Sequence, residues 1–295
     1  MEFSTILAQA CPGLRVETDP QILDSHGRDW SDLPFISPSA VVFTESVEQV
    51  RQLVLAAAEN GIPLVPSGGR TGLSGGAVAA HGEVVVSFDR MRRILEFNPI
   101  DRTVRVEAGV VTAAVQKLAR AKGLYYPVSF ASEGSSQIGG NIATNAGGIR
   151  VLRYGLTREQ VAGLKVVTGR GEVLDCNRGL VKNASGYDLR HLFIGSEGTL
   201  GLVVEATLRL TDPPLPSKVM LLGIESMDTL MRVFDALRTD LALTAFEFFT
   251  DRALHHVRAG HGLPAPLDTA CPLYVIAEFD CPTAVEEDQA MASFE

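Results

Sequence analysis

The stretch IGGNIATNAGG, from Ile138 to Gly148, is almost free of side-chain bulk, yet it holds two asparagines and a threonine. A segment with so little apolar surface contributes little to a hydrophobic core. It can bring backbone N–H groups close around a large polyanionic ligand, because glycine permits close approach and consecutive amides attract anions. The short polar side chains would then fix the polar edges of that ligand.

A similar stretch, PSGGRTGLSGG, occupies residues 66–76 and follows a short predicted strand at Leu64-Val65. A glycine cluster is otherwise explained as an ordinary tight turn. Here both clusters follow extended segments, and both mix glycine with Ser, Thr or Asn. This repetition favours ligand binding over turn formation. The pair predicts a long cofactor that is held at both ends.

Composition restricts the class of protein. The chain has 295 residues, of which 46% are hydrophobic and 21% are charged, as in globular proteins with one large or two medium domains. No apolar run reaches the roughly 18–20 residues of a membrane helix, and no secretory signal is visible. The four cysteines lack C-x-x-C spacing, which predicts a cytoplasmic protein without a structural metal. A net charge of −9 argues against nucleic-acid binding.

Local patterns predict alternating helices and strands. Ser46 and Gln49 have the spacing of a capping box, and Gly61 followed by Pro63 would end the helix that they begin. A second helix is predicted over residues 112–122. Strands are predicted over residues 84–88, 103–106, 164–167, 173–174 and 202–210.

The proline-rich stretch PPLP at residues 213–216 is the best candidate for a domain boundary. It divides the chain into a domain over 1–214, with a core of about 38–212, and a second domain over 215–295. In the second domain, strands are predicted at residues 219–224, 246–249 and 273–279, and helices after Ser226 and over 251–258. Residues 283–295 resemble the beginning of a helix with no end, so the second domain is predicted to be incomplete.

Motifs of other nucleotide-binding, hydrolytic and metal sites are absent or incomplete in this sequence. The dinucleotide fingerprint G-x-G-x-x-G and the P-loop do not occur. Residues 72–76 match the G-x-S-x-G elbow of serine hydrolases, which requires a long helix directly after the serine; residues 77–82 lead instead to another strand. Neighbouring histidines on one helix point to different faces, which disfavours a shared metal ion at His255, His256 and His261.

For two arginines the sequence leaves two roles open, and for three further histidines it indicates none. Arg150 and Arg153 flank the second glycine-rich stretch and are either anion ligands or ordinary surface charges. Three further histidines have no partner that the sequence reveals: His26, His81 and His191.

Four ordered blocks resemble the flavoproteins of the vanillyl-alcohol-oxidase type, which carry a PCMH-type FAD-binding domain. The blocks are residues 66–72, 138–148, 182–189 (KNASGYDL) and 195–203 (GSEGTLGLV). The match extends from about Pro38 to Leu210. Within this family the chain is most similar to the flavin-linked D-2-hydroxy-acid dehydrogenases, through residues 125–137 and 243–249.

The resemblance implies an α+β fold, in which a two-subdomain FAD-binding domain precedes an incomplete, ferredoxin-like α+β capping domain. It implies non-covalent FAD, with the backbone of Ser67–Thr71 on the pyrophosphate and Glu197, Gly198, Gly201 and Val203 at the adenosine end. The implied cofactor-binding residues are Pro66, Ser67, Gly68, Gly69, Arg70, Thr71, Gly72, Pro127, Ser132, Gly139, Gly140, Asn141, Thr144, Asn145, Gly148, Glu197, Gly198, Gly201 and Val203. Ser129 departs from the family, which often has Asp there.

The implied reaction is oxidation of a D-2-hydroxy acid by hydride transfer from Cα to flavin N5. D-2-hydroxyglutarate is the expected substrate, with D-lactate or glycolate as alternatives and an unidentified electron acceptor. In the family, the histidine-rich block with the metal ligands and catalytic base lies beyond the capping domain, so no catalytic residue is assigned here, and weak or no turnover is expected. A non-catalytic flavin-binding subunit and a homodimer remain possible interpretations.

Overall fold

The computed structural model describes residues 3–285, 287 and 290, and the chain divides into two bodies. The first body consists of Met1–Ala146 and Leu156–Thr211, and the second of Gly147–Gly155 and Asp212–Glu295. The sequence-based division kept residues 1–214 together. The structure differs because residues 147–155, which begin at the last two residues of the second glycine-rich segment (residues 138–148), pack with the second body.

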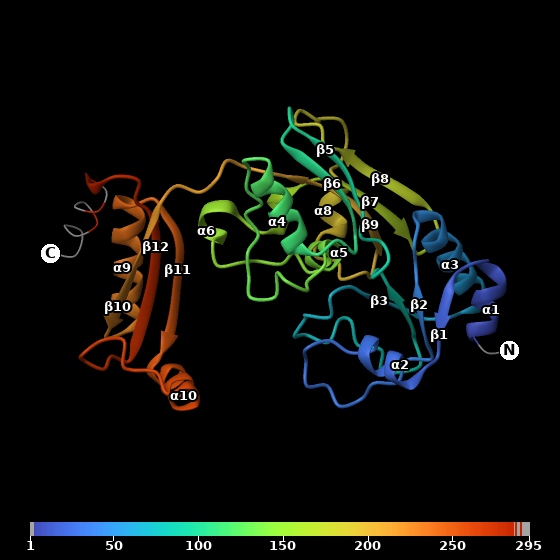
Figure 1. Cartoon of the computed structure of the whole chain (residues 1–295), viewed down its shortest axis with the longest axis horizontal. Helices are drawn as coiled ribbons and strands as arrows, with labels where there is room; N and C mark the ends of the chain where they lie inside the picture. Colours follow the sequence, from blue (N-terminus) through green and yellow to red (C-terminus); the bar gives the residue numbers. More distant parts are fainter. Residues whose placement is uncertain (1–2, 286, 288–289, 291–295) are drawn as a thin grey trace. The chain divides into compact units, whose positions relative to one another are not determined.

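The first body begins with a four-stranded sheet in the order β1-β2-β4-β3. Strands β2, β4 and β3 are parallel, whereas β1 is antiparallel to β2. Helices α1 and α3 cover one face and α2 packs on the other (Figure 1). The bounds are α1 (Phe3–Ala10), β1 (Arg15–Glu17), α2 (Pro20–His26), β2 (Ala40–Phe43), α3 (Val47–Asn60), β3 (Leu64–Ser67) and β4 (Val84–Ser87).

Local chemistry explains α3 and the direction of the chain after it. Ser46 accepts a hydrogen bond from the Gln49 backbone, as the capping pattern predicted, and Gly61 ends the helix in the left-handed conformation. The buried face of α3 packs on the sheet. Strand β3 follows at once and ends at Ser67, so the first glycine-rich segment (residues 66–76) begins at the end of a half-buried parallel strand.

A five-stranded antiparallel sheet, in the order β5-β6-β9-β7-β8, forms the rest of the first body. Helices α4 and α5 contribute to the apolar core on this sheet. The bounds are β5 (Ile94–Asn98), β6 (Thr103–Glu107), α4 (Thr112–Ala121), α5 (Ile138–Ala143), α7 (Thr157–Gln160), β7 (Val161–Thr168), β8 (Val173–Arg178), α8 (Arg190–Phe193) and β9 (Gly201–Arg209).

The sequence predicted no helix in the second glycine-rich segment, but its first half is helical. Residues 138–143 form α5 although they include Gly139 and Gly140, each of which disfavours a helix by about 1 kcal/mol. Buried contacts of Ile138 and Ile142 with the five-stranded sheet override that propensity. The turn follows at Thr144 and Asn145, and Asn145 has a φ of 49°.

The second body contains the antiparallel sheet β10-β12-β11, with α9 packed on one face. Helix α6, from the inserted residues 147–155, packs on β11. The bounds are α6 (Val151–Tyr154), β10 (Ser217–Ile224), α9 (Met227–Asp240), β11 (Leu243–Thr250), α10 (Asp251–His261) and β12 (Leu273–Asp280). The helix predicted to begin within residues 283–295 falls largely outside the described residues.

These elements confirm the predicted mixed α+β fold and exclude the hydrolase alternative. Residues 77–83, which follow Ser74, contain no helix, so the nucleophile elbow is not formed. Within the described part of the chain, no helix combines the length and the apolar character that crossing a membrane requires.

Candidate functional site

The two glycine-rich segments, far apart in sequence, lie against each other in the first body. A Cβ added to Gly68 would lie 3.6 Å from the Gln137 side chain and 3.8 Å from the Gly140 Cα. One added to Gly69 would lie only 2.2 Å from the Ser135 carbonyl oxygen. Glycine is therefore required where the end of β3 meets the residues that lead into α5.

A third stretch, which we call the closing segment (residues 195–201), joins the other two. The Gly195 and Glu197 backbone N–H groups donate to the carbonyl oxygens of Ile142 and Ala143, at 3.0 and 2.9 Å. A Cβ on Gly198 would lie 2.5 Å from Pro66 Cγ. Three of the predicted blocks thus converge on one region of the first body.

Backbone strain concentrates in the same region. Arg70, Asn145 and Glu197 have φ values of 59°, 49° and 51°, in the left-handed region that residues with a Cβ rarely adopt. Each lies in one of the three converging segments. Such conformations cost about 1–3 kcal/mol and typically cluster at ligand-binding sites.

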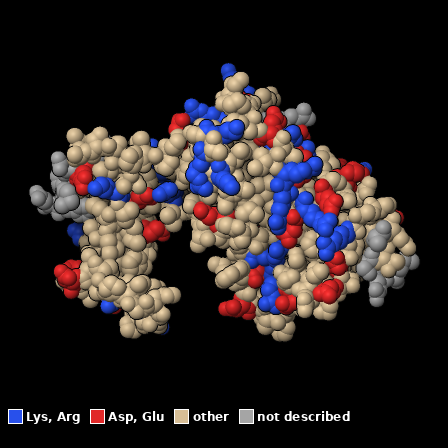
Figure 2. Space-filling view, in the orientation of Figure 1, with Lys and Arg blue, Asp and Glu red and all other residues tan. Residues whose placement is uncertain are grey.

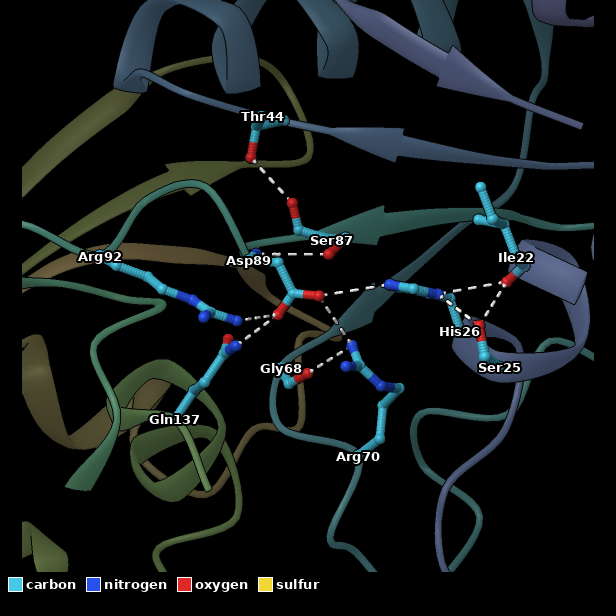
Figure 3. Close-up of polar contacts among 10 residues, drawn as sticks. All are labelled: Ile22, Ser25, His26, Thr44, Gly68, Arg70, Ser87, Asp89, Arg92 and Gln137. Carbon is cyan, nitrogen blue, oxygen red and sulfur yellow. Dashed lines mark hydrogen bonds and ion pairs between the residues drawn. The ribbon is translucent and has the colours of Figure 1, made fainter. Parts of the chain in front are cut away.

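Asp89, two residues after β4, links the two glycine-rich segments (Figure 3). Its Oδ2 accepts hydrogen bonds from His26 Nε2 at 3.2 Å and Arg70 Nη1 at 3.3 Å. Its Oδ1 accepts from Arg92 Nη2 at 2.9 Å and Gln137 Nε2 at 2.7 Å. One carboxylate therefore contacts the first segment through Arg70 and the beginning of α5 through Gln137.

These donors keep Asp89 ionised. Burial opposes ionisation, but the hydrogen bond from His26, the charge of Arg70 and the hydrogen bonds from Arg92 and Gln137 outweigh it, so the pKa of Asp89 falls well below its usual range. The guanidinium of Arg70 also donates to the Gly68 carbonyl oxygen at 3.0 Å. Arg70 thereby fixes its own loop.

We call the place where the end of β3 meets the residues before α5 the junction. Two buried side-chain oxygens there have no hydrogen-bond partner among the described residues: Ser67 Oγ and Gln137 Oε1. Unsatisfied buried polar atoms are uncommon in native proteins and call for a specific explanation.

Gly140 in α5 faces open space, because a Cβ placed on it would meet nothing within 4 Å. The protein itself does not explain the glycine at this position.

The other predicted site residues are distributed as follows. Asn141 is buried and donates to Thr112 Oγ1 at 2.7 Å, so its amide nitrogen bonds inside the protein. Asn145 Oδ1 accepts from the Arg158 backbone at 2.9 Å. The Ser132 carbonyl oxygen accepts a hydrogen bond from the Ser136 backbone N–H at 2.8 Å, which closes a turn. Three positions are exposed or half-buried (Thr71, Gly72 and Thr144), and three are buried (Pro127, Gly201 and Val203).

Gly148 lies in the inserted stretch that groups with the second body, and so do the two arginines whose role was left open. Arg150 Nε and Nη2 donate to the two carboxylate oxygens of Glu278 at 2.9 and 2.8 Å, and Arg153 pairs with Asp280 at 3.5 Å. From the sequence, these arginines were either anion ligands or ordinary surface charges. In the structure both side chains bind carboxylates of β12 instead. The described residues contain no cluster that could hold a metal, including the C-terminal histidines.

Sequence reasoning missed Asp89, His26 and Gln137. His26 was judged to have no partner, yet it contacts an aspartate 63 residues away. No local pattern marks such a pair, because it exists only once β2 and β4 are adjacent. At Ser129 the substitution is accommodated locally, since its hydroxyl donates to Glu133 at 2.9 Å.

Basic and acidic side chains lie next to one another on the face drawn in Figure 2. An anionic ligand of the first body would therefore depend on local amides more than on a broad basic surface.

Comparison with known families gives two matches. Residues 38–177 match the FAD binding domain, and residues 214–295 match the C-terminal domain of FAD linked oxidases. The chain is 60% identical over 289 residues to D-2-hydroxyglutarate dehydrogenase of Xanthomonas citri pv. viticola, covering 98% of this chain and 61% of that protein. It is 36% identical to glycolate oxidase subunit GlcD of Bacillus subtilis, covering 85% of this chain and 53% of the relative.

Among solved structures, alkyldihydroxyacetonephosphate synthase has a TM-score of 0.74 at 19% identity, covering 95% of this chain and 56% of that one. Physcomitrella patens BBE-like 1 has a TM-score of 0.71 at 17% identity, covering 98% and 59%. At these identities the likeness concerns the fold alone. The chain spans 61% of the length of the Xanthomonas relative and 53% of the length of the Bacillus relative.

Proposed function

We propose that this chain, which belongs to the FAD-linked oxidases and carries their FAD-binding domain, holds FAD in the first body, at the junction of residues 66–76, 138–146 and 195–201, for oxidation of a D-2-hydroxy acid. The observation that carries the proposal is the convergence of these segments within one body, around a glycine whose missing side chain faces open space. The family supplies the identity of the cofactor, and the geometry supplies its proposed location.

The chemistry of the junction fits a dinucleotide. A diphosphate needs several hydrogen-bond donors without a bulky side chain between them, and Ser67–Thr71 offer consecutive backbone amides of this kind. The unpartnered Ser67 hydroxyl is a further donor, and the unpartnered Gln137 oxygen is an acceptor at the same junction. Asp89 already binds Arg70, so in this proposal the loop amides and not the guanidinium hold the phosphates.

FAD, when bound, accepts two electrons as a hydride from the substrate. The role of the first body is to bind and orient that cofactor. The proposal assigns no proton-accepting residue among those described, and we expect slow turnover from this chain alone. It also includes non-covalent binding, so acid precipitation should release the flavin into the supernatant.

D-2-hydroxyglutarate is the proposed substrate, because the relatives at 60% and 56% identity both carry the name D-2-hydroxyglutarate dehydrogenase. Glycolate is the alternative that the similarity to a glycolate oxidase subunit supports, and D-lactate is the third candidate. A flavin-binding subunit without catalysis of its own is the alternative from another functional class.

The test combines a spectrum with anaerobic reduction. The purified chain, mixed with FAD and freed of excess, should show flavin absorption bands. D-2-hydroxyglutarate should bleach them slowly, and L-2-hydroxyglutarate should leave them unchanged. Faster bleaching by D-lactate or glycolate would reassign the substrate. A protein that retains no flavin would refute the location of the site as well as the function.

A further inference from the structure

Asp89 is the one carboxylate among the described residues that receives hydrogen bonds both from the first glycine-rich segment and from the residue directly before the second. It belongs to neither region, since it follows β4 and its side chain is only 15% exposed. Figure 3 shows its donors arriving from different elements: His26 from the end of α2, Arg70 from the first glycine-rich segment, Arg92 from the following turn, and Gln137 from the residue before α5.

The contact with Arg70 restrains an unfavourable backbone. Arg70 has a φ of 59°, and a left-handed conformation costs a residue with a Cβ roughly 1–2 kcal/mol. Its guanidinium donates to Asp89 at 3.3 Å and to the Gly68 carbonyl oxygen at 3.0 Å, which closes a short ring across the loop. The direction of the amides in residues 67–71 therefore depends on a carboxylate that lies outside the loop.

The contact with Gln137 restrains the second segment in the same way. Gln137 is the N-cap residue of α5, and its side chain makes no capping hydrogen bond to the helix. It is 2% exposed and donates to Asp89 at 2.7 Å. This hydrogen bond ties to Asp89 the residue directly before the first turn of α5, which contains Gly139 and Gly140.

We propose that Asp89 is a positioning residue for FAD: it holds both glycine-rich segments in their binding geometry through Arg70 and Gln137, without being a flavin ligand itself. This inference rests on the proposed function. It predicts that FAD affinity depends on the charge of a residue outside the recognised cofactor-binding blocks. It also predicts that the effects of Asp89 and Gln137 on affinity are not independent.

The first experiment compares Asp89→Asn with Glu205→Gln. Glu205 is a suitable control because its carboxylate is also mostly buried and pairs with two cations, Arg105 at 3.1 Å and Lys165 at 3.0 Å, on the five-stranded sheet. FAD dissociation constants would be measured by quenching of Trp30, the only tryptophan, whose backbone N–H donates to the Gly72 carbonyl oxygen at 2.8 Å. Thermal unfolding of both apoproteins would be recorded in parallel.

We expect Asp89→Asn to weaken FAD binding by at least about tenfold, the size of one lost hydrogen bond to a charged group. Glu205→Gln should bind FAD with a dissociation constant within about twofold of that of wild type, even if its unfolding temperature falls as much as that of Asp89→Asn. The double variant Asp89→Asn/Gln137→Met should bind no more weakly than the weaker single variant, because the residues act through one contact. Purely structural destabilisation would lower the unfolding temperature of the control and of Asp89→Asn without separating their affinities.

Wild-type affinity for Asp89→Asn would overturn the inference, and so would additive losses in the double variant. Should Asp89→Asn fail to fold, Arg70→Met and Gln137→Met each remove one donor and leave the carboxylate in place; if both bind FAD like wild type, Asp89 is not a positioning residue. Failure of the wild-type chain to bind FAD is a different result, because it refutes the proposed function before any variant is compared.

Discussion

Near its beginning each glycine-rich segment has a pair of adjacent glycines, Gly68-Gly69 as the first glycine pair and Gly139-Gly140 as the second. Within each of these pairs the two residues have different reasons to be glycine. Gly69 and Gly139 are enforced by the protein, since an added Cβ would lie 2.2 Å from the Ser135 carbonyl oxygen or 2.8 Å from Ala108 Cβ. A Cβ on Gly68 would make only ordinary contacts, and one on Gly140 would make none within 4 Å. Packing explains Gly69 and Gly139, whereas no neighbouring atom explains Gly140, which the proposed cofactor would.

The segments also differ in what holds them. The first is an irregular loop whose Arg70 is bound by Asp89 within one body. The second begins as α5 and continues into residues 147–155, which belong to the other body and are bound there through Arg150 and Glu278. Similar composition thus serves a loop that is fixed internally and a helix whose continuation is anchored in a separate body.

Substitution within the first glycine pair should give the largest effect. Gly69→Ala should lower the free energy of unfolding by about 3 kcal/mol, because a rigid backbone oxygen occupies the space of the new methyl group. Gly68→Ala is the matched control and should change stability by less than about 0.5 kcal/mol. Urea unfolding of the two apoproteins measures the difference. Equal stability would show that the contact between the segments does not form in solution.

The anchor of the second segment comes next in size. Arg150→Met should destabilise the second body by about 2 kcal/mol, since it leaves the 7%-exposed Glu278 without its main partner. The value is below the usual range for a broken buried pair because Arg150 is 27% exposed. Arg238→Met, at an exposed pair on α9, is the control and should have almost no effect.

The same anchor predicts a pH dependence with a definite sign. The hydrogen bond from Arg150 outweighs burial and, with the Ser217 hydroxyl, lowers the pKa of Glu278 from 4.5 to about 2. A carboxyl group whose pKa is lower in the folded than in the unfolded state stabilises the fold fully at pH values above its unfolded-state pKa. This stabilisation is lost as the pH falls toward the folded-state pKa. The difference in the free energy of unfolding between wild type and Arg150→Met should therefore narrow as the pH falls from about 5 to about 2. A gap that widens in acid would contradict the assigned pair.

The second glycine pair separates stability from binding. Gly139→Ala should destabilise the apoprotein by about 1 kcal/mol, because Ala108 Cβ lies in the way. Gly140→Ala should stabilise it by roughly 0.5–1 kcal/mol, as expected for alanine in a helix, while weakening FAD binding. Unfolding curves and FAD titrations on both variants provide the comparison. Undiminished FAD affinity in Gly140→Ala would place the cofactor elsewhere.

The sequence predicted the elements whose chemistry is local. The Ser46 cap, the Gly61 helix end and the strands predicted within β7 and β8 follow from residue types and spacing. It did not predict α5, because burial of Ile138 and Ile142 overrides the helix-breaking tendency of two glycines. Nor did it reveal the contacts of His26 with Asp89 or Arg150 with Glu278, which join residues 63 and 128 positions apart.

The claim that the glycine-rich segments form one FAD cradle is tested most directly by titrating the apoprotein with FAD while following Trp30 emission. A single saturable transition with one FAD per chain is expected, and Gly140→Ala should shift it to higher FAD concentration without lowering the unfolding temperature. Absence of any saturable transition in a folded wild-type protein would contradict the account.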